Sequence, residues 1–389
     1  MTPTPPKPHY GYIDCIRGYA VLMVMTGHYA YLFPNLPYPV HRIAVMGWYG
    51  VQLFFITSSL TLLLSWDHEL RTRGVADTRA FFMRRFFRIA PAYYTAGVLY
   101  FFVFPPLGGF DAIQALATAS FLNNWHPALI PTVAGRWNVV PGGWSISVEF
   151  TFYLLFPWFA ALVRSLRAAV LFILATIIVG AIADRIDLTL LAGAYKPAAL
   201  RDFLFFWFPN EASVFGFGAV VFLLIRRAAP PRPTDPRLPI LFAAIAIAAF
   251  FALAFVPLGH FLGDRPFVPA SLAVCPPLAL FVVAMSRLPP GLPSGLLVNR
   301  FAAAMGKVSF SAYLLHFAVL AGLEHVPRLI FADATGYGAI VAFVLVWPVA
   351  ALLVFAIAWC SYSLIERPGM ALGKALIRQR RAAALISTS

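Results

Sequence analysis

Residues 12–29 read YIDCIRGYAVLMVMTGHY, an apolar run that is long enough to enter a lipid bilayer and that carries Arg17 near one end and His28 near the other. Eleven residues at about 100° each make about three helical turns, so the two side chains share one helix face and lie about 16 Å apart. An ionisable residue inside a hydrophobic span is costly and is by default a candidate functional residue. The stretch therefore predicts a membrane helix with a chemically active face.

The composition places the whole chain in a membrane. Of its 389 residues, 61% are hydrophobic and 11% are charged, which excludes an ordinary soluble domain. About 20 apolar residues are needed to cross a bilayer as a helix. On that measure the apolar runs predict an all-α bundle of about ten transmembrane helices, at 12–33, 44–65, 91–106, 149–164, 168–186, 203–225, 238–256, 267–286, 301–323 and 337–362.

The basic residues predict the orientation of these spans. With a cytoplasmic N-terminus, the inner segments hold 22 of the 29 Lys and Arg residues and the outer segments hold 7, in agreement with the positive-inside rule. Both chain ends are therefore expected in the cytoplasm, with a short tail at 1–11, a membrane domain at 12–372 and a basic tail at 373–389. The same rule explains the net charge of +14 without a nucleic-acid partner.

Several chemistries lack their sequence motifs. Cys15, Cys275 and Cys360 have no pair spacing, so neither a disulfide framework nor a metal site is expected. The chain contains no serine-hydrolase elbow, no zinc-protease motif and no Walker loop. No small-residue cleavage site follows the first apolar run, so this span is expected to stay in the membrane rather than leave as a signal peptide.

His28 and Arg17 each have two interpretations. A neutral imidazole such as that of His28 can take a proton from a hydroxyl that attacks a carbonyl carbon, or it can be a structural histidine. Arg17, expected near the cytoplasmic surface, is suited to bidentate phosphate binding, or it can extend to the lipid headgroups. Their common face favours a phosphate-bearing cofactor at Arg17 whose thin arm runs toward His28, near the outer leaflet.

Four more charged side chains have similar alternatives. Arg84, Arg85 and Arg88 precede Pro91 within one helical turn and either anchor the chain at the inner surface or clamp the phosphates of a nucleotide. Glu149 lies at the outer start of the predicted fourth span and must find a partner there. It is expected to orient a histidine, to bind acceptor hydroxyls or to cap its helix.

The predicted outer side also carries groups suited to a sugar. Hydroxyl, amide and indole groups occur at Asn124, Trp144, Ser145 and Ser147, although a tryptophan there is equally typical of a membrane-interface belt. His316, in the outer half of the predicted ninth span, is either a further acceptor ligand or a structural residue. Glu366 and Arg367 are predicted to close the last helix as a structural pair.

Six segments, taken in order, resemble the acyltransferase 3 family of integral-membrane acyltransferases, over about residues 10–372. YIDCIRGYAVLMVMTGH resembles the opening Arg and His motif of that family, and GGWSISVEFTFYLLFP resembles its Trp-Ser-x-Ser-x-Glu motif. The other landmarks are GVQLFFITSSLTL, RRFFRIAPAYY, SFSAYLLHFAV and SYSLIERP. Three positions depart from the pattern: Gln52 stands where an acidic residue is usual, Phe150 where a second Glu is common, and Cys15 where a small residue is usual.

The resemblance implies ten membrane helices, acyl-CoA as the cytoplasmic donor and an essential pair of Arg17 and His28. It also implies an acceptor on or near the outer face. The expected activity is that of a bacterial inner-membrane O-acyltransferase, most simply an acetyltransferase acting on a surface or exported glycan, with no metal. Succinyl or longer donors, the acceptor hydroxyl, an acyl-enzyme step and the oligomeric state stay open. A transporter or flippase and a non-catalytic partner in glycan assembly are the alternatives.

Overall fold

The computed structural model describes residues 11–106, 108–130, 136–191, 193–227, 236–256, 270–289, 294–326, 329 and 334–386. Within these ranges the chain forms helices and turns, with no strand, so the predicted all-α class is confirmed. Apart from Gly11, the predicted tail at 1–11 lies outside the described residues.

The helices of the first half begin with the segment that carries Arg17 and His28. They are α1 (Gly11–Tyr29), η1 (Ala30–Leu32), α2 (Tyr38–Val45), η2 (Met46–Tyr49), α3 (Gly50–Arg73), α4 (Thr78–Val103), α5 (Ala112–Ala119), η3 (Pro127–Leu129), α7 (Gly143–Leu162) and α8 (Leu166–Leu191).

The helices of the second half end in one long rod that contains a π-helical turn, η6. They are α9 (Pro197–Phe206), α10 (Phe208–Arg227), α11 (Arg237–Ala252), η4 (Leu253–Phe255), α13 (Ala270–Ser286), η5 (Ser294–Leu296), α14 (Arg300–Lys307), α15 (Ser309–Leu323), α17 (Gly336–Ser361), η6 (Tyr362–Glu366) and α18 (Arg367–Ile386).

The protein is a multi-pass membrane protein, but the predicted count of ten spans is not confirmed. Among the described residues, seven helices are long and apolar enough to cross a membrane, or eight if α14 and α15, bent by 83°, form one span. Each predicted span overlaps a helix, yet two fall short of that test. The polar side chains of α1 lower its hydropathy, and α13 is only 17 residues long.

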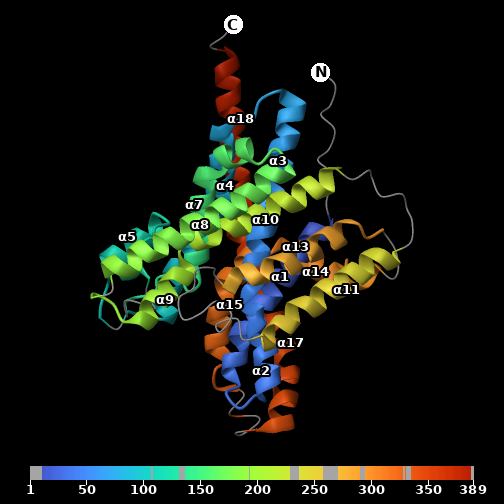
Figure 1. Cartoon of the computed structure of the whole chain (residues 1–389). Helices are drawn as coiled ribbons and strands as arrows, with labels where there is room; N and C mark the ends of the chain where they lie inside the picture. Colours follow the sequence, from blue (N-terminus) through green and yellow to red (C-terminus); the bar gives the residue numbers. More distant parts are fainter. Residues whose placement is uncertain are drawn as a thin grey trace.

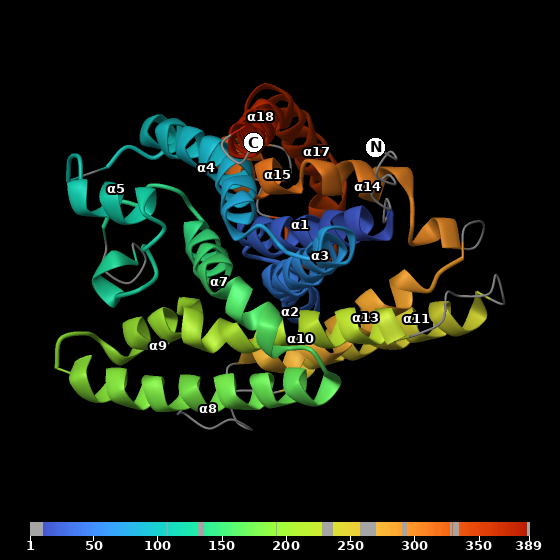
Figure 2. The same ribbon diagram turned by 90° about the horizontal axis from the view of Figure 1, so that it is seen from above.

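The helix that carries Arg17 and His28 lies in the middle of the molecule. Seen from above, α1 and α3 lie between a layer of α8, α10, α11 and α13 on one side and α4, α15, α17 and α18 on the other (Figure 2). In the perpendicular view, α18 and the C-terminal end of α3 lie at the same end of the molecule (Figure 1). Packing of α1 against α3, α14 and α15, and of α3 against α10, is consistent with this order.

Small residues let α1 and α14 touch backbone to backbone. A Cβ built on Gly306 would meet the carbonyl oxygen of Asp14, and one built on Gly18 would meet the carbonyl oxygen of Ala302. Glycine is therefore required at both positions by the close approach of the helices. This contact holds the Arg17 end of α1 in a fixed place.

Three helix boundaries differ from the prediction. The predicted third span starts at Pro91, but α4 begins at Thr78 with Pro91 inside it, because the Asp77 carboxylate caps the helix by accepting a hydrogen bond from the Ala80 amide. Helix α7 begins at Gly143, so Glu149 lies in its second turn rather than at its start. The predicted basic tail at 373–389 continues as helix α18 as far as Ile386.

Candidate active site

Helix α1 carries Arg17 and His28 on one continuous helix, as predicted, and each side chain is half-buried. The two side chains lie in different surroundings. Arg17 faces a polar cavity, whereas the ring of His28 lies among aromatic and imidazole rings. One helix thus connects two distinct sites.

The polar cavity is narrow, with about 60 Å³ open to water-sized molecules. Its lining brings together three guanidinium groups, one carboxylate and several hydroxyl groups from α1, α3, α4, α7 and α15. The charged and hydroxyl-bearing residues are Arg17, Arg85, Arg88, Glu149, Tyr153, Tyr313, Thr57, Ser58, Thr61, Ser145 and Ser309. The arrangement suits an anionic group, because cations outnumber carboxylates on its wall.

Glu149 is held in this cavity by two hydroxyl groups. Ser58 of α3 donates a hydrogen bond to its Oε1 at 2.6 Å, and Tyr153, one turn further along α7, donates at 2.5 Å. Arg17 and Arg85 line the same cavity. The carboxylate was expected at the outer end of its span, far in depth from Arg17. The prediction of a large distance between Glu149 and Arg17 is wrong, because both residues line one narrow cavity.

A second carboxylate, that of Glu366, lies next to Arg88. Glu366, on the π-helical turn η6, is fully buried, lies 4.0 Å from Arg88 and accepts a hydrogen bond from Ser311 at 3.0 Å. The predicted pairing with Arg367 is therefore wrong, because Glu366 pairs with α4 instead.

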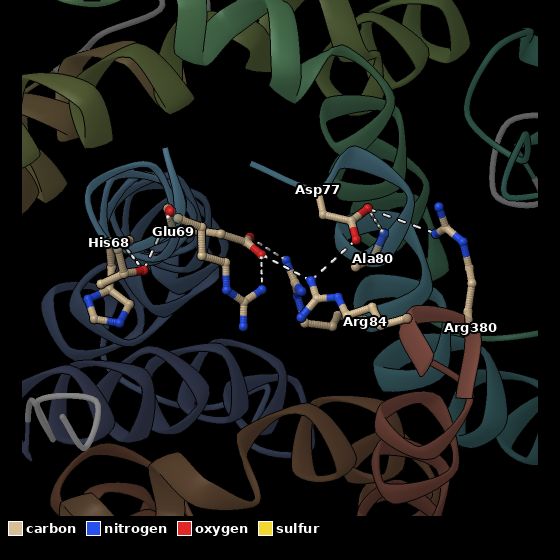
Figure 3. A network of polar contacts seen from close by, with 9 residues as sticks. His68, Glu69, Asp77, Ala80, Arg84 and Arg380 are labelled. Carbon is tan, nitrogen blue, oxygen red and sulfur yellow. Dashed lines mark hydrogen bonds and ion pairs between the residues drawn. The ribbon is translucent and has the colours of Figure 1, made fainter. Parts of the chain in front are cut away.

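The predicted arginine cluster divides into two groups. Arg85 and Arg88 line the cavity, whereas Arg84 points away and pairs with Glu69 of α3 at 3.0 Å. Glu69 also forms ion pairs with Arg73 at 2.9 Å and with Arg381 of α18 at 3.4 Å. Figure 3 shows this network, to which Asp77 is connected because Arg381 also lies 3.2 Å from its carboxylate, with Arg380 at 3.9 Å on Asp77 alone. Glu69 thus ties α3, α4 and α18 together, and Arg84, as one of its partners, does not line the cavity.

His28 and His316 are neighbours in space. Their ring centroids lie 5.4 Å apart, and the ring of Phe317 packs against both, at 4.5 Å from His28 and 4.1 Å from His316. Trp48 lies 6.2 Å from the His28 ring on another side. His316 is completely buried, and its Nδ1 lies 2.6 Å from the carbonyl oxygen of Tyr313. The sequence predicted neither this pairing nor its aromatic cover.

The four residues predicted to bind a sugar have different surroundings. Ser145 lines the polar cavity and is hydrogen-bonded to the Tyr313 hydroxyl at 2.7 Å. Ser147 donates to Phe121 and Asn124, and the Asn124 amide donates to the Phe206 carbonyl at 3.0 Å.

Ser147 and Asn124 are therefore buried residues whose polar groups already have partners inside the protein. Trp144 packs on the ring of Phe206 at 4.8 Å between centroids. Of the four, only Ser145 faces the cavity, and the other three hold α7 against its neighbours.

The sequence reasoning missed several hydroxyl-bearing residues of the cavity, among them the two that hold Glu149. Ser58 belongs to the GVQLFFITSSLTL segment of α3. Tyr153 follows Glu149 by four residues, which places the side chains of Glu149 and Tyr153 on the same face of α7. That spacing was a usable signal for Tyr153. For Ser58 the sequence offers no local signal, because its partner lies 91 residues away.

Gln52 occupies the position where the family resemblance led us to expect an acidic residue, and its side chain has a carboxylate partner. Its amide nitrogen lies 3.2 Å from both carboxylate oxygens of Glu211, and both side chains are buried between α3 and α10. The acidic group of this region thus comes from α10.

A larger and almost wholly apolar cavity lies on another side of α1. It measures about 570 Å³ and is bordered by residues of α1, α2, α11 and α13, among them Leu22, Met23, Ala246, Phe250 and Phe281. The polar groups on its wall already have partners, since Tyr19 donates to the Leu297 carbonyl and Thr26 to the Leu22 carbonyl. Among the described residues, no group of three or more His, Cys, Asp and Glu side chains could hold a metal ion.

Comparison with known proteins gives a family and one relative. Residues 10–363 match the family model Acyl_transf_3, described as an acyltransferase domain. The chain is also similar to "Acyltransferase MdmB" of Streptomyces mycarofaciens, with 27% identity over 325 residues that cover 78% of this chain and 77% of the relative. No solved structure gives a significant match.

Proposed function

The chain belongs to the acyltransferase 3 family and is a membrane acyltransferase, and from this premise we propose a donor, an acceptor and a set of residue roles. The protein moves an acyl group, most simply acetyl, from cytoplasmic acyl-CoA to a hydroxyl of a surface or exported glycan, in the bacterial inner membrane. The observation that carries this proposal is that α1 connects an arginine-lined cavity at Arg17 to a histidine pair at His28.

The arginine-lined cavity is the proposed donor site. Arg17, Arg85 and Arg88 face it together, and the Nε of Arg85 is a buried donor atom with no partner among the described residues. An unsatisfied buried donor is costly, so an incoming anionic oxygen would relieve it. The cavity is narrow and accommodates one charged group or a thin arm, so the bulk of a nucleotide would stay outside it.

Glu149 is assigned to positioning rather than to proton transfer. Its carboxylate is held by Ser58 and Tyr153 in the cavity that Arg17 and Arg85 also line. A carboxylate so placed attracts the guanidinium groups across the cavity and so helps to orient them toward an anion. Ser145 and Tyr313 border the same cavity and are candidate contacts for the reacting groups.

His28 is the proposed general base. It takes the proton of the acceptor hydroxyl while the hydroxyl oxygen bonds to the acyl carbon, and the carbon–sulfur bond of the thioester breaks. The departing thiolate then recovers a proton from the His28 imidazolium. Eleven residues of helix separate Arg17 from His28 by about 16 Å, a distance that a thin donor arm would have to span.

Purified protein, acyl-CoA and a candidate acceptor test the proposal directly. His28→Ala should abolish transfer, whereas His325→Ala, which changes an exposed histidine beyond α15, should leave it unchanged. Wild-type rates in His28→Ala would remove His28 from the chemistry.

The donor site has its own measurement. Arg17→Ala should weaken acyl-CoA binding, compared with Arg378→Ala on the exposed face of α18. Equal donor affinity in the two variants would contradict the assignment of Arg17. Transfer by the purified wild-type protein would also exclude the transporter and the non-catalytic partner. Mass spectrometry of surface glycans, with and without the gene, would identify the acyl group and the acceptor together.

A further inference from the structure

The contact of His316 with the main chain determines which of its nitrogens carries the proton. Nδ1 lies 2.6 Å from the carbonyl oxygen of Tyr313, one turn earlier in α15. A carbonyl oxygen only accepts hydrogen bonds, so Nδ1 must donate, and the neutral ring therefore carries its proton there. Nε2 is left as a lone-pair acceptor.

This acceptor atom has no partner of its own. His316 is completely buried, and its Nε2 makes no hydrogen bond among the described residues. A buried polar atom without a partner is rare in folded proteins and requires an explanation. The explanation is a donor that reaches Nε2 in the working enzyme.

The ring of His28 is the neighbour that can supply this donor. The two imidazoles are 5.4 Å apart between centroids, and Phe317 covers both, which excludes water from that side. At this separation, rotation of the His28 ring about its Cβ–Cγ bond brings a ring nitrogen toward Nε2. The half-buried His28 stays reachable by an acceptor, whereas His316 lies behind it.

We propose that His316 is a positioning residue for His28: its Nε2 accepts a hydrogen bond from one N–H of His28 and so turns the other, unprotonated nitrogen toward the acceptor hydroxyl. The inference rests on the proposed role of His28. When His28 takes the hydroxyl proton, both of its nitrogens carry hydrogen. The bond to His316 then stabilises the imidazolium until the proton passes to the departing thiolate. A hydrogen-bonded group behind a catalytic imidazole works in the same way in the serine-protease triad.

Two substitutions separate this role from simple packing. His316→Phe keeps a ring in the buried space but removes the acceptor atom, whereas His316→Gln restores an oxygen acceptor at a similar reach. We expect His316→Phe to lower kcat about 10- to 100-fold, by analogy with partners that orient a metal-binding histidine, with the KM values for acyl-CoA and acceptor unchanged. His316→Gln should recover most of the lost kcat, and His325→Phe should match the wild type.

Nitrogen NMR of the labelled histidines supplies a readout that does not depend on activity. His28 should show a single tautomer in the wild type and in His316→Gln, and a mixture of tautomers in His316→Phe. The proposal is overturned if the tautomer of His28 is the same in all three proteins. It is also overturned if both His316 variants lose kcat equally.

The two proposals fail in different ways. Full activity in His28→Ala would remove the proposed function of His28, whatever His316 does. Loss of activity in His28→Ala together with wild-type kcat in His316→Phe would remove only the role of His316.

Discussion

Gly306→Ala tests whether the contact between α1 and α14 holds the site together. The added Cβ would lie 1.7 Å from the carbonyl oxygen of Asp14 and 2.5 Å from its carbonyl carbon. Real Cβ atoms essentially never approach closer than 3.0 Å, so the two backbones must separate by at least about 1.3 Å. Neither contact involves a side chain that could rotate away.

The expected cost follows from that displacement. Overpacking a well-packed interior costs about 1–3 kcal/mol, and a clash between two backbones belongs at the upper end of that range. A loss of about 2–3 kcal/mol changes the folding equilibrium about 30- to 150-fold. The shift also moves Arg17, one helical turn from Asp14, relative to Arg85 and Arg88, so donor binding should weaken as well.

Thermal unfolding of the detergent-solubilised protein, followed by tryptophan fluorescence, measures the effect. The matched control is Gly322→Ala in α15, where nothing lies within 4 Å of the added Cβ. In that helical position the alanine should stabilise the protein by about 0.4–1 kcal/mol. Equal melting temperatures for the two variants would refute the reasoning, because they would mean that α1 and α14 do not touch as described.

Two further predictions concern charged groups away from the arginine-lined cavity. Glu69→Gln should lower stability by roughly 1–3 kcal/mol, since hydrogen bonds to a charged group are lost, and limited trypsin digestion should cleave α18 faster; unchanged digestion would show that the network does not hold this helix. The hydrogen bonds from Arg136 hold the pKa of Asp111 below its ordinary value of 3.8. Stability from this pair should therefore be present above about pH 3.8 and be lost as the pH falls through the lowered pKa. Asp111→Asn should flatten that part of the acid-unfolding curve, and an unchanged curve would contradict the assignment.

The elements that could be predicted from the sequence are those encoded locally. The apolar runs locate the helices, and the spacing of Arg17 and His28 along α1 follows from helical geometry alone. The division of the arginine cluster is not encoded locally, because Arg88 is four residues from Arg84 and three from Arg85 and so neighbours both on the helix. Arg84 turns away because Glu69 of α3 pairs with it, whereas Arg85 and Arg88 line the cavity.

The contacts between helices could not be read from the sequence. Glu149 meets Ser58 across 91 residues, and His28 meets His316 only because α15 packs beside α1. Loop charges predict the side of the membrane on which a segment lies, but not how deeply a tilted or bent helix carries a given side chain. For this reason Glu149 was placed too far from Arg17.

The π-helical turn η6 has a mechanical consequence. It joins α17 to α18 in a single rod, of which Gly336–Ala383 alone comprises 48 residues, and at 1.5 Å per residue such a rod is about 70 Å long. A bilayer with its headgroups measures about 40–45 Å, so one end must project well beyond it. Glu366 lies about two thirds of the way along this rod, 4.0 Å from Arg88. Tilting of the projecting end of α18 would displace Glu366 and, through it, Arg88 on the wall of the arginine-lined cavity.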